Sequence, residues 1–419
     1  MHGENEIEAA LQKVVDAGEL AGAATLVWRA GWSEAQTACA GWRDVEAKQP
    51  VERDTIFRIA SMTKPITSVA ALMLLEEGRI ALADPVSRYA PEFSETRVLR
   101  SPEGPLDETD ALERPITFQD LLTHRAGFTY PDFHRGPIAQ AYRDAIGDEI
   151  DSDVAPDEWI TKLASLPLIG QPGAAMYYGQ STDLLGLLLA RIEGTSLGEM
   201  LKRRIFDPLG MNDTSFLVPR QKRDRRAAAY GFDEKGRLIR QVAWSGAFVA
   251  ERPDDMAYES GSGGLWSTVD DYLRFARLFV SDGAVDGVRL LRPETLALMV
   301  TNQLTAGQRV NPPWVGVGVS AGRGFGMGVS TVLETNKADF MRRGSVGTVS
   351  WPGAFGGWWQ ADPQEGSVLI FLAHNMVDLA QMAKGIGLGV WGAIDTFQTL
   401  ASAAFGTGDA SKLADNLEA

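Results

Sequence analysis

The sequence predicts a two-lobe α/β protein, with one lobe built from both ends of the chain and a mostly helical lobe inserted between them. Its 419 residues, 45% of them hydrophobic, exceed the roughly 250–300 residues at which a single hydrophobic core stops growing. Strand-like segments occur near both ends, whereas helical patterns dominate the middle. We therefore expect an α/β domain from residues 1–84 and 258–419, a mostly helical domain from 85–257, and a functional site in the cleft between them.

The N-terminal part carries helical and strand patterns in turn. Apolar residues recur at helical spacing within 6–17. Residues 23–29 and 36–42 are typical of a strand pair that turns near Gly31. A second helix is expected to begin at Ser61 and to continue to Gly78.

Helical patterns in the rest of the chain come first, and strand patterns follow them. After about residue 84, prolines interrupt a polar stretch, and helical patterns follow at 118–123, 156–166, 182–193 and 197–206. Segments rich in β-branched or aromatic residues indicate strands at 324–333, 342–350, 357–362 and 367–374. The apolar stretch 385–405 contains Asp395 and Gln398, so we expect a buried helix packed on the sheet and not a membrane span.

Composition excludes several classes of function. The 40 basic and 55 acidic residues give a net charge of -15, which disfavours nucleic acids and anionic membranes as partners. The expected partner is a small molecule, and the oligomeric state stays open. Cys39 is the single cysteine and is expected to be a buried, inert thiol. The first residues lack the positive and apolar regions of a signal peptide, so a cytoplasmic location is expected.

The stretch from Ser61 to Lys64 is an S-x-x-K motif at the start of a predicted helix. On a helix, residues three apart share a face, so an amine would lie beside a hydroxyl. A serine is a weak nucleophile until a base takes its proton. An ordinary lysine amine has a pKa of about 10.4, so a lysine base needs burial or neighbouring charge to become neutral. The motif alone is weak, because serine is also a common helix N-cap.

Two further segments complete a candidate site. In Pro172-Gly-Ala-Ala-Met-Tyr-Tyr-Gly-Gln180, the phenol of Tyr178 could share the proton as acid and base; the alternative is a packing aromatic. The glycine-rich segment 351–357 predicts a strand edge that a substrate can approach closely. There the backbone N–H of Ala354 could face that of Ser61 as an oxyanion hole; the alternative is an ordinary turn.

With these three parts in this order, the chain resembles the family VIII carboxylesterases, within the class C β-lactamase and penicillin-binding-protein serine hydrolases. The resemblance runs from about residue 21 to 362 and includes the stretches 54–60, 121–128, 207–211 and 260–268. It implies a β-lactamase/transpeptidase-like fold, with an antiparallel sheet flanked by helices and an inserted helical domain. It also implies Ser61 as nucleophile, Lys64 as proton acceptor, Tyr178 as partner acid or base, and an oxyanion hole from the N–H groups of Ser61 and Ala354. Neither a cofactor nor a metal is implied.

Two departures from the β-lactamase pattern bear on the substrate. Gln180 stands where asparagine is usual, and Trp351 stands where lactamases and peptidases carry a lysine that faces the substrate carboxylate. An indole can stack and donate one N–H but carries no positive charge. We therefore expect a serine carboxylesterase for small to medium acyl esters, with weak hydrolysis of some β-lactams.

The substrate is expected to meet Trp351, Gly353, Gln180 and His124, the last in a supporting role through a hydrogen bond. The loops 125–141 and 301–322 are expected to rim the acyl pocket. The alternatives are a β-lactamase, a D-amino peptidase or an acyltransferase of the same fold, or a binding module without activity. Retention of all three motif residues argues against the binding module.

Other motifs have simpler interpretations. Residues 194–198 fit G-x-S-x-G, but the preceding segment is helical, so Ser196 is expected to cap a helix and not to form a nucleophile elbow. Residues 387–392 fit G-x-G-x-x-G without a following βαβ unit. The four histidines, His2, His124, His134 and His374, show no metal-ligand spacing.

Overall fold

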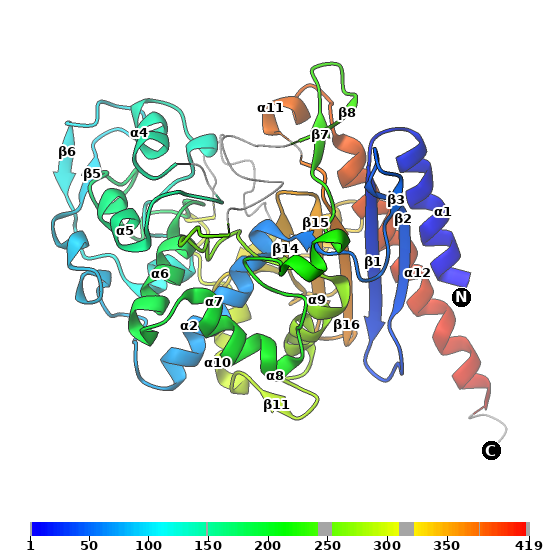
Figure 1. Ribbon diagram of the computed structural model, residues 1–419. Coiled ribbons are helices and arrows are strands. Elements are labelled where there is room, and N and C mark those ends of the chain that lie inside the picture. Colours follow the sequence, from blue (N-terminus) through cyan, green and yellow to red (C-terminus); the bar gives the residue numbers. More distant parts are fainter. Residues whose placement is uncertain (1, 148–149, 242–253, 310–321, 377, 416–419) are drawn as a thin grey trace.

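An antiparallel sheet joins the two ends of the chain (Figure 1). The computed structural model describes residues 2–147, 150–241, 254–309, 322–376 and 378–415. Within them, one sheet has the order β12-β13-β14-β15-β16-β1-β2-β3, and its neighbouring strands run antiparallel. Its strands are β1 (Gly22–Arg29), β2 (Gln36–Asp44), β3 (Gln49–Pro50), β12 (Arg323–Phe325), β13 (Ser330–Val332), β14 (Val349–Gly353), β15 (Gly357–Asp362) and β16 (Ser367–Ala373).

The N-terminal strand β1 pairs with the C-terminal strand β16, from Ala23 opposite Ala373 to Arg29 opposite Ser367. Alternate side chains of a strand point to opposite faces, and both faces of this sheet are buried. Ile370 of β16 joins the core that contains helix α2, whereas Phe371 joins the core shared by α1 and α12.

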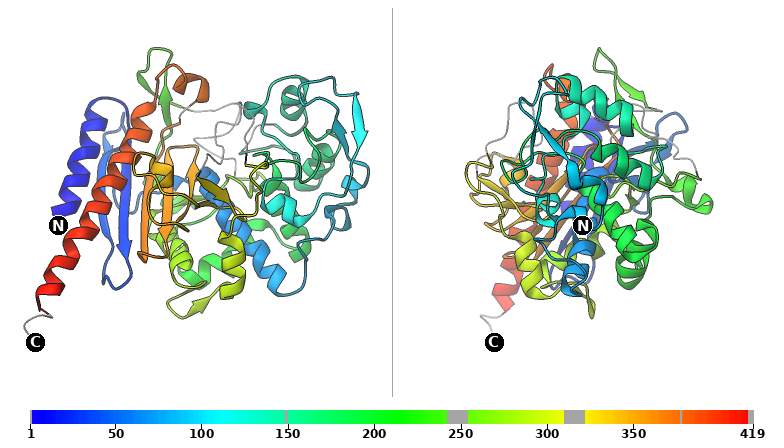
Figure 2. Two further views of the ribbon diagram at one scale, coloured as in Figure 1. Left: turned by 180° about the vertical axis from the view of Figure 1, so that it is seen from behind. Right: turned by 90° about the vertical axis from the view of Figure 1, so that its left-hand side faces the viewer.

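Helices cover both faces of the sheet. The helices α1 and α12 lie side by side on one face, blue and red in Figure 2, while α9 packs on the other. The helices are α1 (His2–Asp16), α2 (Thr63–Glu76), α3 (Phe118–Leu122), α4 (Pro137–Ile146), α5 (Pro156–Ala164), α6 (Ser181–Glu193), α7 (Leu197–Leu201), α8 (Asp207–Leu209), α9 (Val269–Ala276), α10 (Pro293–Val300), α11 (Leu379–Met382) and α12 (Leu388–Asp415).

Short strand pairs and single turns complete the chain. A π-helical turn, η5 (Lys202–Phe206), joins α7 to α8, and a 3-10 turn, η1 (Ala60–Met62), precedes α2. The paired short strands are β4 (Phe57–Arg58) with β9 (Trp266–Ser267), β5 (Arg97–Leu99) with β6 (Thr109–Ala111), β7 (Tyr230–Phe232) with β8 (Leu238–Arg240), and β10 (Ala284–Val285) with β11 (Val288–Arg289).

The predicted antiparallel sheet with flanking helices is present, and the helices α3 to α8 come from the middle of the chain. The domain boundaries at 84/85 and 257/258, and the cleft between the lobes, stay predictions. None of the helices in the described residues combines the length and the hydrophobicity that crossing a bilayer requires.

Two predicted strands were wrong in their extent. The segment 324–333 is two short strands, β12 and β13, because the chain reverses between them at Gly328, which has φ +84. In 342–350 only the end is strand, since Gly344 and Gly347 take φ +94 and +95 and interrupt the extended backbone. The helices α4, α8, α9, α10 and α11 were not predicted at all.

Candidate active site

Ser61 lies in the 3-10 turn η1, between strand β4 and helix α2. The sequence predicted that Ser61 would open the helix itself, whereas α2 begins two residues later at Thr63. The preceding residue, Ala60, has φ +45 and is buried. This left-handed conformation is unfavourable for a residue with a Cβ, so the surrounding packing holds the turn that presents the serine.

Lys64 is buried in the first turn of α2, with 1% of its surface exposed. Its Nζ donates to Ser61 Oγ at 3.1 Å and to the carbonyl oxygen of Ser262 at 3.1 Å. The amine also lies 4.6 Å from the ring centre of Tyr178 and 5.4 Å from that of Tyr130. The amine is therefore held against the serine oxygen by one backbone carbonyl and two aromatic rings.

Tyr178 approaches the same serine from the segment before α6. Its hydroxyl donates to Ser61 Oγ at 2.8 Å and accepts from Trp351 Nε1 at 3.2 Å. The structure therefore brings the predicted amine and phenol together at the oxygen atom of the predicted nucleophile, although Tyr178 lies 117 residues after Ser61 in the sequence.

Trp351 lies on β14 and is fully buried, with 1% of its surface exposed. Its ring centre is 5.4 Å from that of Tyr178 and 5.1 Å from that of Phe325. Its N–H is donated to the tyrosine hydroxyl, so Trp351 supports Tyr178 directly. The cluster beside Ser61 is largely aromatic and consists of Tyr130, Met176, Tyr178, Leu304, Phe325 and Trp351.

His124 and Gln180 are also buried next to this cluster. The His124 ring lies 4.8 Å from that of Tyr178, and its Nε2 is 3.3 Å from Thr182 Oγ1. Burial lowers the pKa of His124 well below its ordinary value, and the nearby charge of Lys64 acts in the same direction. The imidazole is therefore neutral at neutral pH. Gln180 is the N-cap residue of α6, and its Oε1 has no hydrogen-bond partner among the described residues.

Gly353 and Ala354 lie where β14 ends beside the nucleophile turn. A Cβ on Gly353 would stand 2.6 Å from the carbonyl oxygen of Ile59, so only glycine lets the strand approach this closely. Ala354 follows in the turn between β14 and β15 and is exposed. Its N–H thus belongs to the backbone that packs next to Ser61, and its part in an oxyanion hole stays a prediction.

A comparison with known proteins places the chain. A protein-family model described as Beta-lactamase matches residues 7–387. The chain belongs to this β-lactamase family. Protein Rv1367c of Mycobacterium tuberculosis is 42% identical over 374 residues, which cover 89% of this chain and 90% of that protein. Esterase EstB of Burkholderia gladioli is 30% identical over 386 residues, covering 88% and 90%.

A solved structure shares the fold. The structure of "EstCE1, a hydrolase with promiscuous acyltransferase activity" matches with a TM-score of 0.74 at 25% identity, covering 94% of this chain and 97% of that one. These matches confirm the predicted β-lactamase/transpeptidase-like fold and the resemblance to esterases within the class C β-lactamase superfamily. The chain is a serine hydrolase of the β-lactamase superfamily.

Sequence reasoning missed three residues of this β-lactamase-family site. Tyr130 OH donates to Ser262 Oγ at 2.9 Å, and the fully buried Asp183 accepts from the N–H of Ser262 at 3.2 Å. Tyr130 lies in the predicted 125–141 rim, and Ser262 lies in the family stretch 260–268. Asp183 could have been found as a carboxylate in the first turn of a helix that starts just after Tyr178. Of the other predicted rim, only 301–309 and 322 lie within the described residues.

The alternative serine of this β-lactamase-family chain has a structural role. Ser196 is the N-cap of α7, where its Oγ accepts from the N–H of Glu199 at 3.2 Å. This matches the predicted helix cap. The G-x-G-x-x-G segment 387–392 runs into α12, after the last strand of the sheet.

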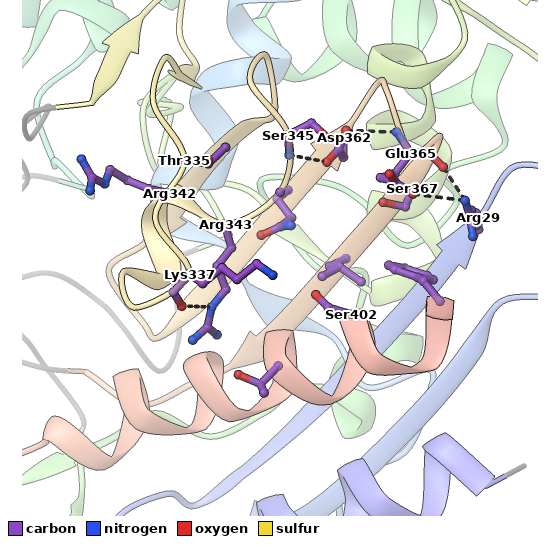
Figure 3. Close-up of a pocket in the computed structure, with 15 residues that line it drawn as sticks. Arg29, Thr335, Lys337, Arg342, Arg343, Ser345, Asp362, Glu365, Ser367 and Ser402 are labelled. Atoms are coloured by element: carbon purple, nitrogen blue, oxygen red, sulfur yellow. Dashed lines mark hydrogen bonds and ion pairs between the residues drawn. The ribbon is translucent and has the colours of Figure 1, made fainter. Parts of the chain in front are cut away.

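A pocket of about 600 Å³ lies away from Ser61, between α12 and the sheet (Figure 3). It contains none of the predicted site residues. Its arginines are paired with carboxylates: Arg29 with Glu365 at 3.1 Å and Arg343 with Asp395 at 2.7 Å. These ion pairs leave little net charge for a ligand, so we place the chemistry at Ser61. The pocket is lined by Arg29, Thr335, Lys337, Arg342, Arg343, Gly344, Ser345, Gln360, Asp362, Glu365, Ser367, Leu369, Thr399, Ser402 and Phe405.

Proposed function

We propose that this protein is a serine carboxylesterase of the family VIII type, which hydrolyses small to medium acyl esters through an acyl-enzyme on Ser61. The observation that carries the proposal is the convergence of two proton-carrying groups on the serine oxygen, Tyr178 OH at 2.8 Å and Lys64 Nζ at 3.1 Å. The expected partner is a small-molecule ester, with no nucleic acid, membrane or cofactor involved, and we retain the cytoplasmic location as a proposal.

Acylation follows from this geometry. Ser61 Oγ attacks the ester carbonyl while its proton passes to neutral Lys64, and the tetrahedral oxyanion receives hydrogen bonds from the N–H groups of Ser61 and Ala354. The C–O bond of the ester then breaks, and the leaving alkoxide takes a proton through the Tyr178 hydroxyl. Water attacks the acyl-enzyme next and gives one proton to Lys64 by way of the Tyr178 hydroxyl. The bond between the acyl carbon and Ser61 Oγ then breaks, Ser61 Oγ takes that proton back, and the carboxylic acid leaves.

The aromatic surroundings of the serine favour neutral acyl groups. Trp351 supplies no cation for a substrate carboxylate, and its N–H is already donated to Tyr178. We therefore rank esters above penicillins or D-amino peptides and expect only weak β-lactam hydrolysis. An acyltransferase is the second candidate, because EstCE1 is described as a hydrolase with promiscuous acyltransferase activity; an alcohol would then replace water in the second step.

Ester hydrolysis by single-residue variants tests the proposal. We expect Ser61→Ala and Lys64→Ala to lose nearly all hydrolysis of p-nitrophenyl acetate and butyrate. Ser196→Ala is the matched control, since this serine caps α7, and it should keep wild-type turnover. Intact-mass analysis should find an acyl or fluorophosphonate adduct on wild-type protein and none on Ser61→Ala. Near wild-type turnover by Ser61→Ala would refute the proposal.

A charge-restoring variant tests the substrate class. Trp351→Lys should raise nitrocefin hydrolysis relative to ester hydrolysis, because it supplies the cation that the site lacks. An unchanged ratio of the two rates would contradict our account of substrate selection.

A further inference from the structure

Asp183 is a buried carboxylate close to the candidate base, with no exposed surface. It lies in the first turn of α6, where the helix dipole stabilises a negative charge. Its Oδ1 accepts from Ser260 Oγ at 2.5 Å and from the N–H of Ser262 at 3.2 Å. Its Oδ2 lies 3.5 Å from the Tyr130 hydroxyl. A carboxylate that is buried away from solvent needs hydrogen-bond donors from the protein, and the serine and tyrosine residues around Asp183 supply them.

The groups that hold Asp183 also hold Lys64. Ser262 gives its N–H to Asp183, while its carbonyl oxygen accepts from Lys64 Nζ at 3.1 Å. Tyr130 donates to Ser262 Oγ at 2.9 Å, and the lysine Nζ lies 5.4 Å from the Tyr130 ring centre. One serine residue and one tyrosine therefore connect the carboxylate to the amine.

We propose that Asp183 is a positioning residue for Lys64: it fixes the Ser262 carbonyl and the Tyr130 ring around the amine, and its negative charge stabilises the ammonium that forms when Ser61 is acylated. The inference rests on the proposed function. It adds to it a group that does not touch the substrate but governs the proton transfer.

Several charged and titratable groups surround Asp183. Its pKa is raised above the ordinary value because burial outweighs the charge of Lys64 and the hydrogen bonds from Ser260 and Ser262, which lower it. Tyr130 and Tyr258 are further titratable neighbours, and the pKa of Tyr258 is raised well above its ordinary value by burial and by the charge of Asp183. Tyr258 thus stays a neutral phenol, and the ammonium that forms on Lys64 during acylation is the cation that the carboxylate stabilises.

The replacement Asp183→Asn keeps the shape and removes the charge. A nearby anion favours the charged form of an amine, so without it the amine becomes neutral at lower pH. The acid limb of kcat/KM against pH should move down by about 1 unit or more. Since the ammonium formed in acylation loses its counter-charge, the plateau should fall about tenfold, the factor that one unit of proton affinity represents. Damaged packing alone would lower the plateau without moving the limb.

A second variant and a matched control keep the test decisive. Ser260→Ala removes one donor, so Asp183 holds its charge less well and the limb should move the same way by a smaller amount; this variant serves if Asp183→Asn does not fold. Asp271→Asn removes another buried carboxylate, which accepts from Thr214 Oγ1 at 2.9 Å and the N–H of Asp213 at 2.7 Å. Its limb should coincide with that of the wild type.

The readout separates this inference from the proposed function. The pH dependence of fluorophosphonate labelling, followed by intact mass, is measured for each variant beside Ser61→Ala. Labelling of Ser61→Ala at the wild-type rate would overturn the proposed function. Labelling confined to Ser61, with acid limbs of Asp183→Asn and Ser260→Ala that coincide with that of the wild type, would overturn the role of Asp183 alone.

Discussion

Replacing Tyr178 with phenylalanine removes a single oxygen atom from the centre of the candidate site. The ring remains, so its packing against Trp351, His124 and Tyr130 is retained. The lost atom donates to Ser61 Oγ at 2.8 Å. Because positioned general acid–base groups contribute about 10²–10⁴-fold, we expect kcat to fall by about that factor for p-nitrophenyl acetate.

The same substitution should also lower stability. Trp351 is 1% exposed and gives its N–H to the Tyr178 hydroxyl at 3.2 Å. In Tyr178→Phe this buried donor has lost that acceptor, at a cost of about 1–3 kcal/mol. Trp351→Phe leaves no such donor and keeps the contact between Tyr178 and Ser61, so its kcat should fall less. In the double variant the two stability losses should be less than additive, because the orphaned donor is absent.

Two measurements examine these expectations. Stopped-flow release of p-nitrophenol gives the acylation rate of each variant, and thermal unfolding gives the midpoints for the double-mutant cycle. If Tyr178→Phe acylates within about tenfold of the wild-type rate, the phenol does not carry the proton. If its melting midpoint is unchanged, the phenol oxygen is not needed as the acceptor of the Trp351 N–H.

Other substitutions probe the scaffold. Gly353→Ala would place a Cβ 2.6 Å from the carbonyl oxygen two residues before the nucleophile, so kcat should fall with a smaller change in KM, as steady-state kinetics would reveal. Arg58→Met breaks a buried ion pair with Asp151 at 2.6 Å, in which the two side chains are 0% and 2% exposed. Denaturant unfolding should show a loss of about 3–5 kcal/mol in the free energy of unfolding. Arg53→Met breaks the more exposed pair with Asp270 and should cost under about 1 kcal/mol. Burial lowers the pKa of His374 to about 4, below the unfolded value of about 6.5, so stability should fall as pH drops from about 6.5 to about 4. The melting midpoint of His374→Gln should be less sensitive in that range, and equal sensitivity would exclude the histidine as the cause.

Local patterns in the sequence predicted much of the fold. The segment 357–362 coincides with β15, because its strand pattern is uninterrupted between two turns. The S-x-x-K spacing predicted the contact between Lys64 and Ser61, since residues three apart on a helical turn share a face. In contrast, no local pattern shows that Asp183 and Ser262 meet, because they are brought together only when α6 packs near the 260–268 segment. The hydrogen bond from Trp351 to Tyr178 could not be predicted either, because the two residues meet only in the folded chain.

The pairing of β1 with β16 bears on how the protein is made. Ala23 is translated long before its partner Ala373. At about 5–20 residues per second, β1 waits for tens of seconds with the edge that will pair with β16 unpaired. An unpaired strand edge is a template for aggregation, so this edge of β1 is open to pairing with other chains until β16 has been made.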